Sequence, residues 1–163
     1  TEGGEEGDII FSRDESHLFF DFGGRLLVSR VLSGQFPNWE AVIPRNNDRM
    51  FTIGRDEVAA AIRRVAILAD ERSKAVRFLL SKGGLEIASS HSDLGDASEK
   101  LEIEYDQEEF QIGFNYQYLI DFLSTIPEVE VSFEFKDGES ATQLRALPGE
   151  EIKSRYIVMP MRI

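Results

Sequence analysis

A stretch of sequence that occurs twice most constrains how this chain can fold. The motif Phe-x-Ile-Gly begins at Phe51 and again at Phe110, which is 110 − 51 = 59 residues later. Each copy is followed by a polar residue suited to cap a helix, Asp56 in the first and Asn115 in the second. A fixed period of this kind indicates two copies of one supersecondary unit.

The apolar residues that follow the two caps recur with helical spacing. They lie at i, i+3, i+4 and i+7, as one buried face of a helix requires. The first set is Val58, Ala61, Ile62 and Val65, and the second is Tyr116, Leu119, Ile120 and Leu123. The sequence therefore predicts helices over about 56–69 and 115–126. These stripes align at an offset of 116 − 58 = 58, so one residue separates the helix alignment from the motif alignment.

Alternating apolar and polar residues on either side of these helices indicate strands. We expect strands at 8–12, 17–22, 25–32, 74–81, 85–90, around 101–106, and at 129–135, 140–147 and 154–162. Together with the strands that carry the two motifs, residues 47–162 form a β-α-β-β-β unit written twice. The predicted fold is α+β, with antiparallel sheets and two helices on one face.

The opening 39 residues carry three predicted strands and no preceding helix, which matches the back half of such a unit. We therefore expect a partial domain with its connector over 1–39 and a complete domain over 40–163. On this interpretation, the chain begins inside a preceding domain.

The charge and composition exclude several functions. The chain has 18 Lys and Arg against 30 Asp and Glu, a formal charge of −12, so bulk charge cannot grip nucleic-acid phosphates. There is no Cys, and the only histidines, His17 and His91, have no second ligand at metal spacing. We expect no catalytic residues, metal or cofactor. No apolar run approaches the roughly 18 residues of a membrane span, so we expect no membrane partner.

Three stretches resemble the signatures of a known family, the bacterial DNA polymerase III beta subunit, or sliding clamp. They are Gly-Gln-Phe-Pro-Asn-Trp-Glu-Ala-Val-Ile-Pro at 34–44, Ile-Gly-Phe-Asn at 112–115, and Tyr-Ile-Val-Met-Pro-Met-Arg-Ile at 156–163. Their order is that of the end of the middle domain followed by the C-terminal domain. Family members are homodimeric rings of six similar domains, whose helices line a central hole that holds duplex DNA. The resemblance implies a cytoplasmic, non-catalytic processivity factor, which encloses DNA instead of gripping it.

The resemblance also implies a hydrophobic cleft between the middle and C-terminal domains. Clamp-binding peptides of the replicative polymerase, the clamp loader and repair proteins dock there. The matching positions are Pro37, Val42, Asn115, Tyr118, Ile157, Met159, Pro160, Met161 and Arg162. Met and aliphatic side chains adapt to varied apolar anchors. The other interpretation of Met159–Met161 is an ordinary edge strand with buried sulfurs. This chain departs from the family at Ala41, where a basic residue is frequent, and at Ser73, where some members carry an aromatic residue.

Two further sets of residues match functional surfaces of the family. Arg55, Arg63 and Arg64 match the helix that faces DNA, although a solvated helix face would read the same way. Ile67 and Leu68 match the apolar contact with the partner subunit, or they simply complete the helix stripe. We expect a homodimer for the full-length protein and no closed ring for this fragment. The second hypothesis is a stand-alone acidic α+β interaction domain unrelated to replication.

Overall fold

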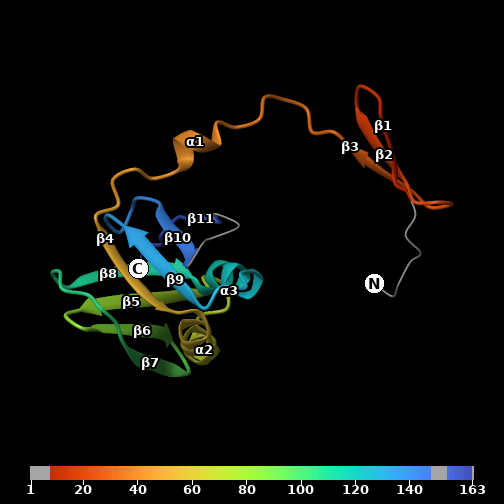
Figure 1. Cartoon of the computed structure of the whole chain (residues 1–163). Helices are drawn as coiled ribbons and strands as arrows, with labels where there is room; N and C mark the ends of the chain where they lie inside the picture. The colour runs from red at the N-terminus through yellow and green to blue at the C-terminus, as the bar shows by residue number, and fades with distance from the viewer. Residues whose placement is uncertain (1–7, 148–153, 163) are drawn as a thin grey trace. The chain divides into compact units, whose positions relative to one another are not determined.

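The computed structural model describes residues 8–147 and 154–162. The chain divides into two compact units, Thr1–Asn38 and Trp39–Ile163. The first unit is a three-stranded antiparallel sheet in the order β1-β2-β3 (Figure 1). Its strands are β1 (Ile10–Arg13), β2 (His17–Asp21) and β3 (Leu26–Arg30). The three strands predicted for the start of the chain are therefore present.

The turn between β2 and β3 is a glycine hairpin, as the sequence predicts. Gly23 and Gly24 both have positive φ angles, 67° and 104°, which residues with a Cβ rarely adopt. The carboxylate of Asp21 accepts hydrogen bonds from the backbone N–H groups of both glycines, at 3.0 and 3.4 Å. The turn thus fixes the register in which Asp21 faces Leu26.

The second unit contains the β-α-β-β-β order twice (Figure 1). After α1 (Trp39–Val42), the first copy is β4 (Arg49–Gly54), α2 (Arg55–Val65) with the short 3-10 helix η1 (Ala66–Leu68), β5 (Ala75–Ser81), β6 (Gly84–His91) and β7 (Gly95–Glu102). The second copy is β8 (Phe110–Asn115), α3 (Tyr116–Thr125), β9 (Glu130–Phe135), β10 (Thr142–Leu147) and β11 (Arg155–Val158). This confirms the duplication and the α+β class.

The two copies exchange their first strands. One sheet has the order β11-β10-β9-β4 and the other has the order β7-β6-β5-β8. Gly54 of β4 pairs with Glu130 of β9, while Asn115 of β8 pairs with Ala75 of β5. The paired positions correspond, because 115 − 54 = 61 for the first strands and 130 − 75 = 55 for their partners. Neither copy completes its own sheet, so the second unit folds as one body.

The copies are equivalent at an offset of 61 residues, and the motif offset of 59 is wrong. Helix α2 begins at Arg55 and α3 begins at Tyr116, which gives 116 − 55 = 61. Buried Phe51 therefore corresponds to buried Ile112. Side chains in a strand alternate with a period of two, so a shift by two residues keeps the same side chains on the same face. The Phe-x-Ile-Gly motif therefore recurs on the inner faces without marking equivalent positions.

The predicted cap of the first helix is also wrong. Asp56 lies inside the first turn of α2, and the N-cap is Gly54, which has no side chain to accept a hydrogen bond. Asn115 is confirmed as the cap of α3, since its side chain accepts a hydrogen bond from the N–H of Gln117 at 2.9 Å. Asp56 instead forms an ion pair with Arg55 at 2.9 Å.

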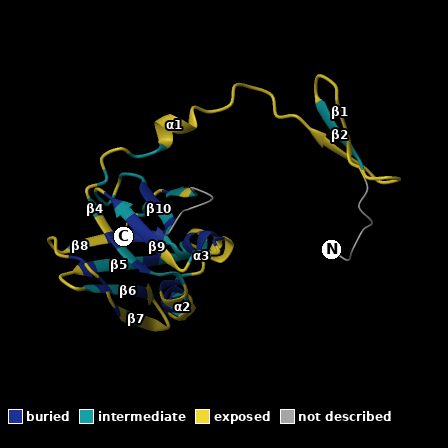
Figure 2. Cartoon of the chain, in the orientation of Figure 1, coloured by how far each residue is buried: buried dark blue, intermediate teal, exposed yellow. Residues whose placement is uncertain are grey.

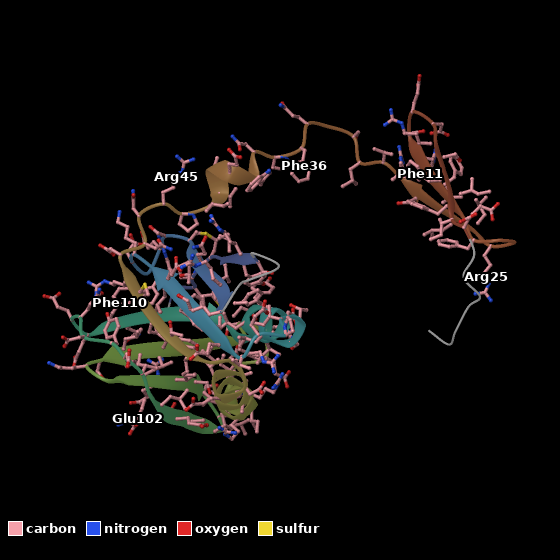
Figure 3. All side chains as sticks on the ribbon, in the orientation of Figure 1. Phe11, Arg25, Phe36, Arg45, Glu102 and Phe110 are labelled. Carbon is pink, nitrogen blue, oxygen red and sulfur yellow. The ribbon has the colours of Figure 1, made fainter. Side chains whose placement is uncertain are left out.

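A cluster of phenylalanines joins the two sheets in the core. Phe78 of β5 and Phe133 of β9 are fully buried, and their ring centroids lie 5.8 Å apart. They are equivalent residues of the two copies, because 133 − 78 = 55. At the start of β8, Phe110 stacks on Phe135 at 5.3 Å, and the guanidinium of Arg49 lies 4.9 Å from the Phe110 ring (Figure 3).

The two helices cover this core side by side, as predicted (Figures 1 and 2). The stripe predicted for α2 is buried throughout, at Val58, Ala61, Ile62 and Val65. In α3 the buried residues are Leu119, Phe122 and Leu123, while Tyr116 and Ile120 are partly buried. Phe122 was missing from the predicted stripe.

Three predicted boundaries differ from the structure. The first α-helix ends at Val65 and continues only as the 3-10 turn to Leu68. The last strand ends at Val158, two residues before Pro160, which has no N–H to donate to a neighbouring strand. The expected loop after residue 90 is a tight hairpin, because β7 already begins at Gly95.

Candidate peptide-binding site

The C-terminal segment crosses from one sheet of the second unit to the other. Val158 pairs with Thr142 at the edge of the first sheet. Three residues later, the N–H of Met161 donates to the carbonyl of Gly113 on β8 at 2.8 Å. Strand β8 is an edge strand of the second sheet. The segment Met159–Met161, called the C-terminal tail below, is therefore held at both ends.

The tail meets the start of helix α3. Gly113 lies two residues before Asn115, so the Met161–Gly113 bond brings the tail to the strand that leads into this helix. Asn115 uses its side-chain oxygen to cap the helix. Tyr118, in the first turn, is 52% exposed. Five of the predicted cleft residues thus gather on one part of the second unit: Asn115, Tyr118, Met159, Pro160 and Met161.

An aromatic stack anchors β11 to α3. The rings of Tyr156 and Phe122 are nearly parallel, with centroids 4.8 Å apart. Burial raises the pKa of Tyr156, and the charges of Asp121 and then of Tyr118 raise it further. Tyr156 is a residue that the site prediction missed. Its place in the alternating pattern of the last strand was the one signal that could have found it.

The tail presents flexible apolar surface. Met159 is 61% exposed, so the interpretation with buried sulfurs does not hold for this residue. Ile157, Pro160 and Met161 are half-buried, and Arg162 is exposed. Such a surface suits a ligand with varied apolar anchors, because the unbranched Met side chain adapts its shape.

The other two predicted cleft residues lie on the connecting segment. Pro37 belongs to the first unit, and Val42 lies in α1 of the second unit with 56% exposure. The eight predicted cleft residues other than Pro37 can therefore be placed within one unit.

The three predicted DNA-facing arginines have different environments. Arg55 is committed to structure, since one guanidinium nitrogen donates to the carbonyl of Ile126 at 2.6 Å. Arg64 forms a two-pronged ion pair with Glu99 of β7, and this hydrogen bonding holds the pKa of Glu99 below its usual value. Arg63 is exposed, and none of the described residues forms an ion pair with it.

The predicted dimer contacts lie at the end of the same helix. Ile67 in η1 is 76% exposed, so it does not complete the buried stripe of α2. Leu68 is half-buried. An exposed isoleucine here leaves an apolar contact open for another surface.

The described residues contain no cluster of three or more His, Cys, Asp or Glu side chains that could hold a metal ion. Among the helices of residues 8–147 and 154–162, none is long and apolar enough to cross a membrane. The geometry instead defines a non-polar strand-and-tail surface beside a helix start, on a duplicated β-α-β-β-β domain. This architecture is that of the DNA clamps.

Comparisons with known proteins agree with this class. The family model for the C-terminal domain of the DNA polymerase III beta subunit matches residues 40–162. The beta sliding clamp of Caulobacter vibrioides is 35% identical over 160 residues, which cover 98% of this chain and 42% of that protein. The clamp of Treponema pallidum is 34% identical over 161 residues, covering 96% of this chain and 43% of the relative. The chain therefore belongs to the DNA polymerase III beta subunit family, the beta sliding clamps.

Solved structures show the same likeness. A Pseudomonas aeruginosa sliding clamp bound to griselimycin has a TM-score of 0.83 and 30% identity, covering 95% of this chain and 42% of that one. A Caulobacter crescentus clamp has a TM-score of 0.84 and 33% identity, with 95% and 41% coverage. The chain spans about two fifths of the length of the relatives it matches. The match is to their C-terminal part, so the second hypothesis, an unrelated stand-alone domain, is not supported.

Proposed function

We propose that this chain is the peptide-docking part of a replication processivity clamp. The C-terminal tail carries this proposal. It places Met159 and Met161 beside Asn115 and Tyr118, at a junction where both sheets and α3 meet. In the proposed complex, the apolar tail receives the hydrophobic anchors of a linear peptide, while Asn115 and Tyr118 hold its backbone. The partners are clamp-binding peptides of the replicative polymerase, the clamp loader and repair proteins.

We assign residues 1–39 to the back half of a middle clamp domain and its connector, and 40–163 to the C-terminal domain. Two features support this assignment. The first unit is a three-stranded sheet without a helix, which corresponds to β5-β6-β7 or β9-β10-β11 of the duplicated domain. It also carries apolar residues on successive positions, such as Phe19 and Phe20, so both faces of the sheet need a cover.

In the full-length protein, the proposed role is a homodimeric ring around duplex DNA in the cytoplasm. Exposed Ile67 and half-buried Leu68 are the proposed contacts with the partner subunit. Arg63 is the proposed DNA contact from α2, whereas Arg55 and Arg64 are already paired within the chain. The proposed ring is non-catalytic, because enclosure of DNA replaces any chemistry on it.

Titration with a peptide of the Gln-x-x-Leu-Phe type tests the docking role. Met161→Ala should weaken binding about tenfold or more, because the anchors lose an apolar wall. Met50→Ala is the matched control, since Met50 is 55% exposed on β4, at the opposite edge of the sheet from β11. Equal loss in the two variants, or no binding at millimolar peptide with the fold intact, would refute the proposal.

A further inference from the structure

The end of the C-terminal tail is tied to the turn between β9 and β10. A guanidinium nitrogen of Arg162 lies 3.1 Å from a carboxylate oxygen of Glu139, which is 23 residues away in sequence. Beyond Val158, the other described anchor of the tail is the backbone bond from Met161 to Gly113. Pro160 contributes no N–H. The side-chain pair therefore determines where the guanidinium of Arg162 sits.

The turn that carries Glu139 is well ordered by a neighbouring carboxylate. One oxygen of Asp137 accepts from the N–H of Glu139 at 3.0 Å and from that of Ser140 at 2.6 Å. Its other oxygen accepts from the Ser140 hydroxyl at 2.9 Å. This side-chain turn presents Glu139 from a fixed backbone position.

The ion pair borders an open hollow. The hollow has a volume of about 550 Å³, and its lining includes Gly113, Gly138 and Met161 together with the two charged residues. The side chains of Arg162 and Glu139 are 88% and 74% exposed. An ion pair this exposed contributes little free energy, because water competes for both charges. A second carboxylate that reaches Arg162 can therefore replace Glu139 at small cost, and a guanidinium fork suits a carboxylate particularly well.

We infer that Glu139 is a specificity-determining residue of the peptide site, which occupies Arg162 in the free protein and yields it to a carboxylate on the docking peptide. The inference rests on the proposed docking function. It assigns a role to a residue on the β9–β10 turn, which the site prediction did not include. The peptide that fits best carries an acidic residue next to its apolar anchors.

Two peptides that differ at one position test this inference. Both have the form Gln-x-x-Leu-Phe, with either Glu or Gln in the position beside the Leu-Phe pair. Glu139→Gln should tighten binding of the Glu peptide about two- to fivefold and leave the Gln peptide unchanged, since an exposed pair has an energy of that order. The gain should disappear in high salt. In Arg162→Gln, the two peptides should bind alike.

Asp106→Asn provides a matched control, because it opens an equally exposed ion pair with Lys82 on another turn. It should change neither affinity. If Glu139→Gln weakens both peptides equally, Glu139 merely supports the tail and the inference is wrong. It is also wrong if the variant binds the Glu peptide as the parent does.

The two proposals fail in distinguishable ways. If Met161→Ala abolishes binding but Glu139→Gln has no effect, docking stands and only the role of Glu139 falls. If the parent protein binds neither peptide, both are contradicted.

Discussion

The guanidinium of Arg55 donates to the carbonyl oxygen of Ile126 at 2.6 Å, so the first residue of α2 caps the last turn of α3. The backbone repeats this link in both copies. The N–H of Arg55 donates to Val129 at 2.8 Å, and that of its equivalent, Tyr116, donates to Lys74 at 2.9 Å. The start of each helix is thus fixed to the other copy, but only Arg55 adds a side-chain contact.

Arg55→Met should therefore destabilise the second unit. We expect a loss of about 1.5–3 kcal/mol in the free energy of unfolding, because a carbonyl at the helix end loses a charged donor. Urea denaturation measures this loss. Arg63→Met is the control and should stay within about 0.5 kcal/mol, since Arg63 is exposed. Equal effects would show that Arg55 has no structural role.

Removal of the cap of α3 should cost stability in a way that another cap restores. Asn115→Ala should lower the unfolding free energy by about 1 kcal/mol, because the N–H of Gln117 loses its acceptor. Asn115→Ser should recover most of this loss, since Ser caps helices about as well as Asn. A serine variant as unstable as the alanine variant would contradict the cap.

Truncation of the aromatic core should unfold both copies together. Phe133→Ala should cost about 3–5 kcal/mol, because Phe133 is fully buried and contacts both Phe51 and Phe78. Circular dichroism and hydrogen exchange should show β5–β8 and β9–β11 losing protection in one step. Tyr118→Ala, at a 52% exposed site, is the control. Loss of one copy with the other intact would contradict the exchanged strands.

Acid should weaken the turn that carries Glu139. Hydrogen bonds from Glu139 and then Ser140 hold the pKa of Asp137 below its ordinary value of 3.8. A carboxyl with a lowered folded pKa stabilises the fold above its unfolded pKa, and this contribution is lost as pH falls through the folded pKa. Stability should therefore decline below about pH 3.8. Asp137→Asn should show a smaller decline, and an identical acid profile would contradict this.

The sequence was informative wherever a pattern is local. Alternation located the strands, and helical spacing found the stripe from Val58 to Val65. The pairing of β4 with β9 could not be predicted, because register between distant strands depends on tertiary packing. The same limit explains the wrong repeat offset. Phe51 and Phe110 share a motif, but pairing across the sheets makes Phe51 equivalent to Ile112.

The candidate site was predictable in part. The apolar run at Met159–Met161 and the polar start of α3 are visible in the sequence, and the structure brings the tail to Gly113, beside Asn115. Side-chain partners are not visible. Neither the contact of Arg55 with Ile126 nor that of Arg162 with Glu139 follows a local spacing, since the partners are 71 and 23 residues apart.

The most direct test of the docking site is a residue-by-residue NMR titration of the chain with a Gln-x-x-Leu-Phe peptide. The account predicts that the largest shifts fall at Asn115, Tyr118 and the residues from Ile157 to Arg162, with β7 unperturbed. Shifts centred on β7, or on the acidic hollow around Glu57 and Glu130, would contradict a docking site at the C-terminal tail.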